Sequence, residues 1–395
     1  MKYPKILLNK DGVKKVLKGH LWLTLDDVKS AKTSVEKIEA GSLVSLYSEE
    51  KYFLAQAYFN PEVRYSIKIL SREGSIINKE FFVKMFKKAL KVRKEVYPGE
   101  TAFRLIFSEG DYLPGLIVDV YDKVAVLQIY TLGMEKLLGE IIPALREVLN
   151  LSGIVLKNDA QKRKEEGLPL YVEVAWGKVS EPILVEMDGI KFLIPVLSGQ
   201  KTGFYLDQRE ARRYLARLAE GKEVLDLYSY LGGFSFYALK SKAKRAILVD
   251  RSQSALNLAE EIAKLNGFSD RVILIKEDVL IYLKNPSYVA DIVIADPPAF
   301  IKSKGDISQG LKLYESLYFS CVKLFHQNDG FLALFSCSHF LGKDDQEEII
   351  RRSLAKLGLK GRLIKKLNQA SDHPINPFVK ETYYLKGLVL YLDGE

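Results

Sequence analysis

Short apolar runs alternate with helical patterns from about residue 205 onwards. Apolar residues have helical spacing at 206–219, before the first run, and at 254–267, after the second. The apolar runs, each interpreted as a buried strand, are 224–229, 245–250, 271–278, 291–298 and 331–338. This alternation predicts an α/β fold with a parallel, doubly wound sheet. Ligands of such sheets bind at the carboxyl ends of the strands.

The preceding residues show two other patterns. Runs rich in aromatic and branched residues, separated by turn residues, lie at 43–48, 52–59 and 66–70. They predict a small β-rich module. A helix at 78–96, a strand pair within 103–130 and a helix at 134–149 then predict a mixed α+β section. We therefore divide the chain into domains at 1–72, 73–180 and 181–395.

Composition narrows the class of protein. The 395 residues carry a formal net charge of +9, which suits a polyanionic partner such as a nucleic acid. The basic stretch 84–96 is explained as simply by a solvated helix face. No apolar run could span a bilayer or serve as a signal core, and the two cysteines form no disulfide framework or metal-ligand spacing. We expect a cytoplasmic protein with no membrane segment and no metal.

Acidic residues stand at the ends of the predicted strands. Asp250 ends the second run, where a carboxylate can accept hydrogen bonds from both ribose hydroxyls, although it could equally cap a helix. Asp278 ends the third run, in position for an adenine amino group, and Asp296 ends the fourth, before two stiffening prolines. Neither GxGxxG nor GxxxxGK[ST] is present. The pattern therefore favours S-adenosylmethionine over a dinucleotide or a nucleoside triphosphate.

Five motifs carry a resemblance to a known family. They are GDYLPGLIVDVY (110–121), GQKTGFYLDQRE (199–210), VLDLYSYLGGFS (224–235), DPPAF (296–300) and FSCSHF (335–340). The sequence resembles the class I S-adenosylmethionine-dependent RNA methyltransferases of the cytosine-C5 ribosomal RNA type, in the subgroup with an N-terminal PUA domain. The resemblance implies a Rossmann-like catalytic domain, a PUA domain at 1–72 and large-subunit ribosomal RNA as the partner. A homodimer is compatible with it.

The resemblance also implies a cofactor site. Its residues would be Gln200, Lys201, Thr202, Asp226, Tyr228, Gly232, Asp250, Asp278, Asp296 and Pro297. The first three belong to a motif that closes over the cofactor, and Asp296 with Pro297 would border both the cofactor and the target base.

Cys337 is the candidate nucleophile. C5 of cytosine is a weak nucleophile until a thiolate adds to C6 and raises the electron density of the ring. Cys337 lies at a predicted strand end, in the same cleft as Asp296. The alternative for Cys337 is a small packing residue, which is the usual role of a free cysteine. Cys321 lies on an apolar helical stripe with Tyr314 and Leu317, and we interpret it as structural.

Residues around the DPP motif complete the predicted site. Some related enzymes carry a second cysteine after the prolines, where this chain has Ala299, so another group must release the product. His339 is a candidate, although a local hydrogen-bonding role is the simpler explanation. Phe300 would either stack on the flipped-out base or pack under its loop, and Lys302 is placed for a phosphate.

Two other functions remain open at this point. An RNA methyltransferase acting on guanine or on an exocyclic amine would use the DPP motif without a thiol nucleophile. A catalytically inactive RNA-binding assembly factor would need neither the thiol nor the cofactor acids. The intact acids disfavour the second alternative.

Overall fold

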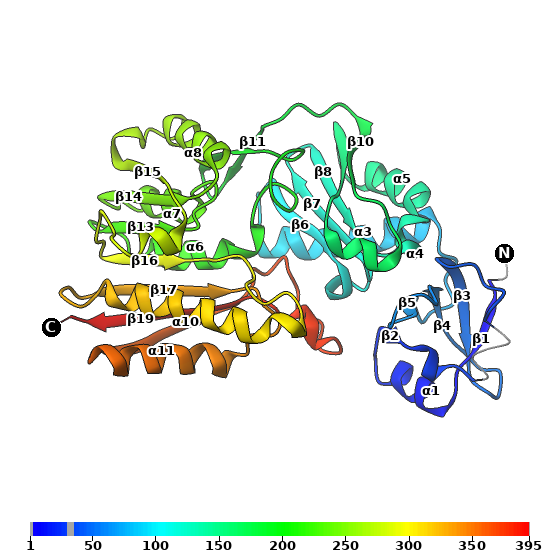
Figure 1. Cartoon of the computed structure of the whole chain (residues 1–395). Helices are drawn as coiled ribbons and strands as arrows, with labels where there is room; N and C mark the ends of the chain where they lie inside the picture. Colours follow the sequence, from blue (N-terminus) through cyan, green and yellow to red (C-terminus); the bar gives the residue numbers. More distant parts are fainter. Residues whose placement is uncertain (1–2, 30–34, 395) are drawn as a thin grey trace. The chain divides into compact units, whose positions relative to one another are not determined.

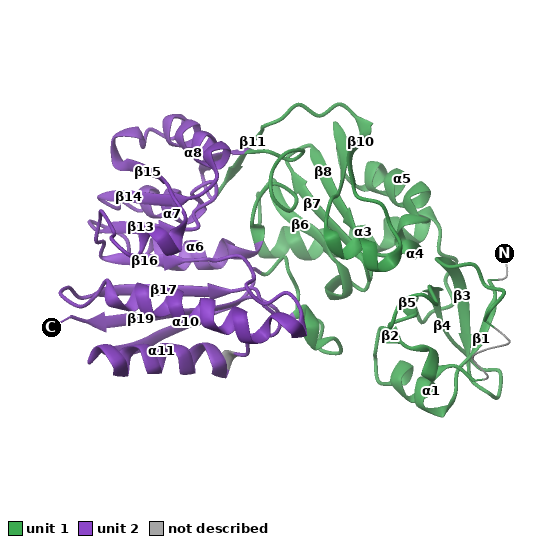
Figure 2. Cartoon of the chain, viewed as in Figure 1, with its two compact units in different colours: residues 1–187, 194–206, 371–382 green, residues 188–193, 207–370, 383–395 purple. Residues whose placement is uncertain are grey.

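The computed structural model describes residues 3–29 and 35–394, which cluster into two units. The first unit comprises 1–187, 194–206 and 371–382, and the second comprises 188–193, 207–370 and 383–395 (Figure 2). The chain thus leaves and re-enters each unit. The three-domain division predicted from the sequence stays a prediction, because the β-rich module and the middle section belong to one unit.

A five-stranded sheet forms the N-terminal part of the first unit. Its order is β1-β3-β4-β5-β2, and the strands are β1 (Lys5–Leu7), β2 (Trp22–Leu23), β3 (Ser42–Tyr47), β4 (Phe53–Phe59) and β5 (Ile67–Ser71). A helix that the sequence analysis missed, α1 (Lys10–Leu17), follows β1. The Asn9 side chain caps this helix by accepting a hydrogen bond from the Gly12 amide. Val379, from the segment 371–382, packs in the core of this sheet.

A second five-stranded sheet also belongs to the first unit (Figure 1). Its order is β10-β9-β8-β7-β6, and the strands are β6 (Ala102–Phe107), β7 (Leu116–Tyr121), β8 (Val124–Ile129), β9 (Gly153–Asn158) and β10 (Tyr171–Gly177). The strand pair expected within 103–130 is wrong, because three strands lie there. The turn between β7 and β8 is only two residues long, and Asp122 has a left-handed φ of 54° in it.

Helices cover the apolar residues of this second sheet. They are α3 (Lys79–Val96), α4 (Leu132–Glu135) and α5 (Leu138–Val148). The Asn78 side chain caps α3 by accepting a hydrogen bond from the Phe81 amide. Phe82 and Phe86 of α3 and Ile141 of α5 are fully buried in one cluster with the sheet. The apolar side chains of α3 therefore face the core, and its lysines face outward.

The second unit is built on a seven-stranded sheet of order β15-β14-β13-β16-β17-β19-β18. Its strands are β13 (Glu223–Leu227), β14 (Arg245–Asp250), β15 (Val272–Lys276), β16 (Ile292–Ala295), β17 (Gly330–Ser336), β18 (Lys360–Leu367) and β19 (Lys386–Asp393). The first five strands in the order are parallel, and β19 runs antiparallel to both of its neighbours. The doubly wound α/β sheet predicted from the sequence is confirmed.

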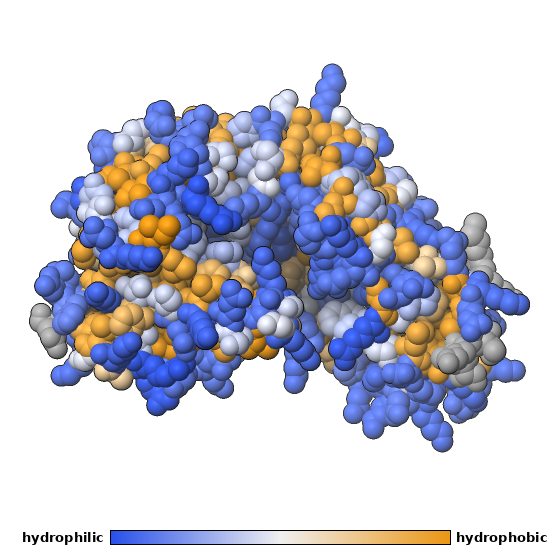
Figure 3. Space-filling model, viewed as in Figure 1, coloured by the Kyte–Doolittle hydropathy of each residue, from blue (hydrophilic) through white to orange (hydrophobic). Residues whose placement is uncertain are grey.

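Helices connect the strands of this sheet (Figure 1). They are α6 (Arg209–Ala216), α7 (Gly233–Lys240), α8 (Gln253–Leu265), α9 (Val279–Tyr282), α10 (Ile307–Lys323) and α11 (Lys343–Leu357). The hairpin strands β11 (Ile183–Met187) and β12 (Ile190–Ile194) lie where the chain first passes from one unit to the other. Among the described residues no helix is long and apolar enough to cross a membrane. The face shown in Figure 3 is mostly hydrophilic, with separate apolar patches.

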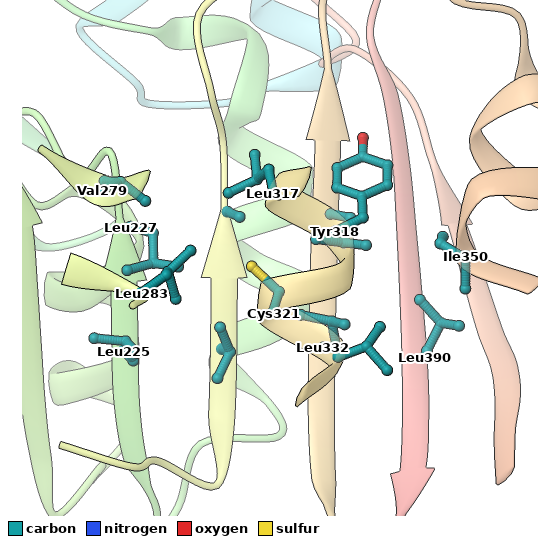
Figure 4. Close-up of a cluster of buried hydrophobic side chains, with 14 of the residues drawn as sticks. Leu225, Leu227, Val279, Leu283, Leu317, Tyr318, Cys321, Leu332, Ile350 and Leu390 are labelled. Carbon is teal, nitrogen blue, oxygen red and sulfur yellow. The ribbon is translucent and has the colours of Figure 1, made fainter. Parts of the chain in front are cut away.

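Cys321 lies in a hydrophobic core of the second unit. It is fully buried on α10, in one cluster with Leu317, Tyr318 and Leu332 (Figure 4). Burial raises the pKa of its thiol far above the ordinary value. The interpretation of Cys321 as a packing residue is confirmed. Cys337, in contrast, is only partly buried.

The two cysteines should therefore differ in their effect on stability. We expect Cys321→Ser to lower the free energy of unfolding by about 1–2 kcal/mol, because a hydroxyl enters an apolar cluster. Cys337→Ser should change it by less than about 0.5 kcal/mol. Urea unfolding followed by circular dichroism would measure both. Equal losses for the two variants would contradict the assignment of Cys321 to the core.

Candidate cofactor and nucleophile site

The carboxyl ends of the parallel strands meet along one edge of the seven-stranded sheet. Because β13 lies between β14 and β16, and β17 follows β16, the residues after these strands are brought together. Strand β15 lies on the other side of β14, and burial, followed by the charge of Asp278, raises the pKa of Tyr228. The predicted residues that the second unit gathers at this edge are Asp226, Tyr228, Gly232, Asp250, Asp278, Asp296, Pro297, Phe300 and Cys337.

The loop after β13 has an unusual backbone. Tyr228, Tyr230 and Gly232 have left-handed φ values of 60°, 49° and 75°. A left-handed conformation is costly for a tyrosine, and such residues concentrate at functional sites. Asp250 holds the loop by accepting a hydrogen bond from the Tyr230 amide at 2.9 Å. The Ser229 hydroxyl is buried there and has no hydrogen-bond partner among the described residues, so it is available to a ligand.

Asp226 lies beneath this loop. It is 1% exposed, and its Oδ2 accepts hydrogen bonds from the hydroxyl of Ser235 at 2.8 Å and from the Ser235 amide at 3.2 Å. Burial raises the pKa of Asp226 to about 7, and the charge of Asp296 adds to the shift, against the hydrogen bonds of Ser235 and the charge of Arg212. Asp226 thus joins the end of β13 to the first turn of α7.

The raised pKa of Asp226 leads to a prediction about the stability of the fold. Because the pKa of Asp226 is higher in the fold than in the unfolded chain, ionisation destabilises the fold as pH rises from about 4 towards about 7. Asparagine has nearly the same shape, still accepts the Ser235 hydrogen bonds and cannot ionise. We expect Asp226→Asn to raise the thermal midpoint relative to the wild type, and to raise it more at pH 8 than at pH 5.

Calorimetric scans of both proteins at the two pH values would measure this. Asp226→Ala serves as the control, because it cannot ionise either but loses the hydrogen bonds of Ser235, so its midpoint should lie below that of Asp226→Asn in both buffers. A difference between Asp226→Asn and wild type that is the same at pH 5 and pH 8 would show that the Asp226 carboxyl does not titrate in this window.

Asp250 and Asp278 are both tied to the backbone. The second oxygen of Asp250 accepts a hydrogen bond from the Ser252 amide at 2.8 Å, while the Ser252 side chain caps α8. The cap of α8 is therefore Ser252 and not Asp250. Asp278 itself caps α9, because its Oδ1 accepts hydrogen bonds from the amides of Leu280 and Ile281. The ribose and adenine roles of these two acids stay predictions.

The segment around Cys337 is held by its two flanking serines. The hydroxyls of Ser336 and Ser338 each form a 3.0 Å hydrogen bond with the phenol of Tyr314 on α10. Ser338 also accepts a hydrogen bond from the Ile301 amide at 3.3 Å. The serines are buried and Cys337 between them is partly exposed, as expected where side chains alternate along an extended segment. Burial raises the pKa of Tyr314, so its hydroxyl stays neutral.

Phe300 belongs to the same set of contacts. Its ring centroid lies 4.8 Å from that of Tyr314 and 6.5 Å from that of Tyr228. These contacts favour the packing role of Phe300 over base stacking, and Phe300 is only partly buried. Lys302, two residues later, is exposed. Tyr314 was missed as a site residue. Its signal in the sequence was a phenol on an apolar helical stripe, since a buried hydroxyl needs a partner.

Arg212 is a second residue that sequence reasoning missed. It is 4% exposed on α6, and burial lowers its pKa while the charges of Asp207 and Asp296 oppose that shift. A Cβ atom at Gly233 would lie 2.7 Å from Arg212 Nε, so the second glycine of the loop makes room for this side chain. Asp296 is half-buried, and its backbone amide donates to Leu227. A buried cation therefore accompanies the acids at this sheet edge.

The predicted residues 200–202 lie in the first unit. The Thr202 hydroxyl is buried and donates to Asp119 Oδ2 at 2.6 Å. Arg104 pairs with both oxygens of Asp119 at 2.7 Å. Gln200 accepts a hydrogen bond from the phenol of Tyr205, whose ring lies 4.1 Å from the Lys201 ammonium. The contact of Gln200, Lys201 and Thr202 with the cofactor stays a prediction.

Comparison with known proteins decides the family. A model of a PUA-like domain matches residues 6–72, and one of an S-adenosylmethionine-dependent methyltransferase matches 172–321. "Ribosomal RNA large subunit methyltransferase I" of Pseudoalteromonas translucida is 33% identical over 384 residues, 95% of this chain and 96% of that protein. The protein of the same name from Alteromonas mediterranea is 33% identical over 392 residues, 98% of each chain. The chain belongs to this family.

Membership of the family confirms the resemblance found in the sequence. The crystal structure of a protein described as a methyltransferase and complexed with SAH has a TM-score of 0.82 at 24% identity, covers 99% of this chain and 100% of its own, and shares the fold. The protein is thus an S-adenosylmethionine-dependent methyltransferase with an N-terminal PUA-like domain. The residues present fit this cofactor, because Ser229 offers a buried hydroxyl and Asp250 and Asp278 offer acids along the same sheet edge.

Proposed function

We propose that the protein methylates C5 of a cytosine in large-subunit ribosomal RNA, with Cys337 as the nucleophile. The observation that carries this proposal is the setting of Cys337. It is partly exposed at the end of β17, next to the end of β16 where Asp296 lies, and hydrogen bonds of its two neighbours fix the backbone on either side. The names of the relatives supply the class of substrate.

The chemistry requires a nucleophile on one carbon of the ring and a methyl donor at the next. S-adenosylmethionine supplies an electrophilic methyl group on a sulfonium. The thiolate of Cys337 adds to C6, and the electrons of the C5–C6 double bond move to C5. C5 then forms a bond to the methyl carbon as the bond to the sulfonium sulfur breaks. A base removes the C5 proton, the double bond returns and the S–C6 bond breaks.

Asp296 has the second role in this proposal. Its carboxyl can hydrogen-bond the N3–N4 edge of cytosine and stabilise charge that develops on the ring after addition at C6. The half-buried position of Asp296, with the buried charge of Arg212 nearby, suits a fixed polar contact. Phe300 would border the base as part of the pocket wall, and Lys302 would contact a phosphate on the exposed side of the loop.

The identity of the methylated nucleoside tests whether Cys337 is the nucleophile. We expect unmodified ribosomal RNA incubated with labelled S-adenosylmethionine to yield labelled 5-methylcytidine with wild type. Cys337→Ala should yield at least about a thousandfold less, because addition to C6 is lost. Mass spectrometry of the digested RNA identifies the nucleoside. Cys321→Ser is the control and should keep the activity.

Other outcomes separate the alternatives. Labelled guanosine or adenosine, or unchanged activity of Cys337→Ala, would overturn the cysteine mechanism in favour of methylation without a thiol. RNA binding by wild type without S-adenosylmethionine binding in calorimetry would favour an inactive assembly factor. RNA with 5-fluorocytidine gives an independent readout, since the fluorine at C5 cannot leave as a proton and wild type should stay covalently attached.

A basic groove in the first unit supports RNA as the partner. The groove has a volume of about 510 Å³ and runs between β5 and α3. Phe81 and Met85 belong to its apolar lining, while the cationic side chains of Arg72, Lys84 and Lys88 also line it. Glu73 pairs with Lys84 at 2.9 Å and offsets part of this charge. We propose that phosphates of the RNA bind these cations, which gives the basic stretch 84–96 a function beyond solvation.

Helix α3 offers a matched control for this role. Lys84 and Lys88 line the groove, whereas Lys87 and Lys91 have the same spacing, are exposed and do not line it. We expect the double change Lys84→Gln and Lys88→Gln to weaken RNA binding and to reduce the slope of log K against log salt by about 1.4. The double change Lys87→Gln and Lys91→Gln should leave the slope nearly unchanged. Filter binding at several salt concentrations measures the affinity and the slope for both double variants. Equal effects of the two would reject the groove as a site of RNA binding.

The proposal also covers the cellular location of the protein and its oligomeric state. A cytoplasmic enzyme is supported by the ribosomal RNA substrate in the names of the relatives. Sedimentation of the purified protein would show whether it forms the homodimer that the sequence allows.

A further inference from the structure

A lysine that the site prediction did not include lies beside the Cys337 segment. Lys386 is the first residue of β19 and is 6% exposed. Its ammonium donates to the carbonyl of Ser338 at 2.9 Å and to that of Tyr384 at 3.0 Å. The antiparallel register places Lys386 opposite Ser336. A buried positive charge is therefore fixed on the carbonyl of Ser338, the residue that directly follows Cys337.

Burying an ammonium is costly unless its surroundings compensate the charge. Carbonyl oxygens compensate part of it through their dipoles. A thiolate on the neighbouring residue would complement it further, and the interaction would be strong because a partly buried site screens charge less than water does.

Among the described residues, buried Arg212 of α6 also brings positive charge to this sheet edge, where it interacts with Asp296, and the other titratable groups near Cys337 are acids, phenols or an exposed histidine. Asp296 after β16 would oppose ionisation of the thiol, and Tyr314 of α10 is a neutral phenol. From the C-terminal side come His339, which is exposed, and Tyr384, whose ring lies 6.3 Å from that of His339. The phenol of Tyr384 donates to Asp207 at 2.6 Å, which adds a second acid. Acids in this position favour a protonated thiol.

We propose that Lys386 is a positioning residue that stabilises the thiolate of Cys337 before the cofactor binds. The role rests on the proposed function of Cys337 as the nucleophile. Lys386 acts through its charge on the segment 336–338 and touches neither the base nor the methyl group. The competing role is purely structural, in which the ammonium only ties the end of β17 to the start of β19.

Alkylation of the thiol separates the two roles without RNA. The full-length protein is treated with iodoacetamide between pH 5.5 and 9.5, and the rate at Cys337 is followed by mass spectrometry of its peptide. We expect the rate profile of Lys386→Gln to move up by about one pH unit or more, which lowers the rate at pH 7 about tenfold. Lys386→Arg, which keeps the charge and the donors, should retain the wild-type profile.

Two controls keep the result specific. Lys365→Gln removes an exposed lysine of the neighbouring strand β18 and should leave the profile unchanged. Thermal unfolding checks that each variant is folded. If Lys386→Gln does not fold, the wild type still decides, because an alkylation midpoint at or above the ordinary thiol value of about 8.5 would overturn the proposal.

The outcome is independent of the product assay. Coincident profiles of wild type and Lys386→Gln would assign Lys386 a structural role only. Loss of the cysteine mechanism would appear instead as methylation by Cys337→Ala, whatever the alkylation profile shows. The two proposals can therefore fail separately.

Discussion

The shared hydrogen bonds of the Tyr314 hydroxyl hold the candidate site together. One phenol on α10 joins Ser336 and Ser338 on either side of Cys337, and its ring packs on Phe300 of the DPPAF loop. The end of β17 and the loop after β16 are thereby fixed to the same helix. A nucleophile must be held to within a fraction of an ångström to be effective, and here backbone and second-layer hydrogen bonds supply that rigidity. Ser336 and Ser338 of FSCSHF thus hold the backbone on both sides of Cys337.

Charge is distributed unevenly along the sheet edge. The acids Asp226, Asp250, Asp278 and Asp296 lie in or after the ends of four adjacent strands, which suits a cationic sulfonium and a nucleoside. The same acids work against a thiolate. Buried Arg212 and Lys386 place positive charge on this edge, from α6 and β19 respectively. In the proposed mechanism one site must bind a cationic sulfonium and also ionise a thiol, and the positive charges of Arg212 and Lys386 would favour the second of these.

The sequence predicted the strands, which have a local pattern, but not the site side chains whose position depends on how distant elements pack or pair. Strands β13 to β17 were found because each is an apolar run with an acid or a cysteine at its end. Tyr314, Arg212 and Lys386 were not found as site residues, because each reaches the site from an element whose neighbour is set only by tertiary packing. Lys386 is the clearest case, since it lies 49 positions after Cys337 in the sequence and is brought beside it only by the antiparallel pairing of β17 and β19. Helix α1 was missed for a different reason, because its lysine-rich sequence has a single fully apolar buried residue, Val16, beside Gly12.

The segment 371–382 shows why the domains cannot be separated by one cut in the chain. It belongs to the first unit, where Asp372 accepts a hydrogen bond from the Arg104 amide at 2.9 Å and Val379 packs in the core of the N-terminal sheet. Phe378 lies against Gly19, where a Cβ atom would come within 2.6 Å of its ring. Four residues after this segment the chain reaches Lys386, which is hydrogen-bonded to the residue after Cys337. The stretch that contributes to the core of the N-terminal sheet and the lysine bonded to Ser338 are therefore close in the sequence, although they belong to different units.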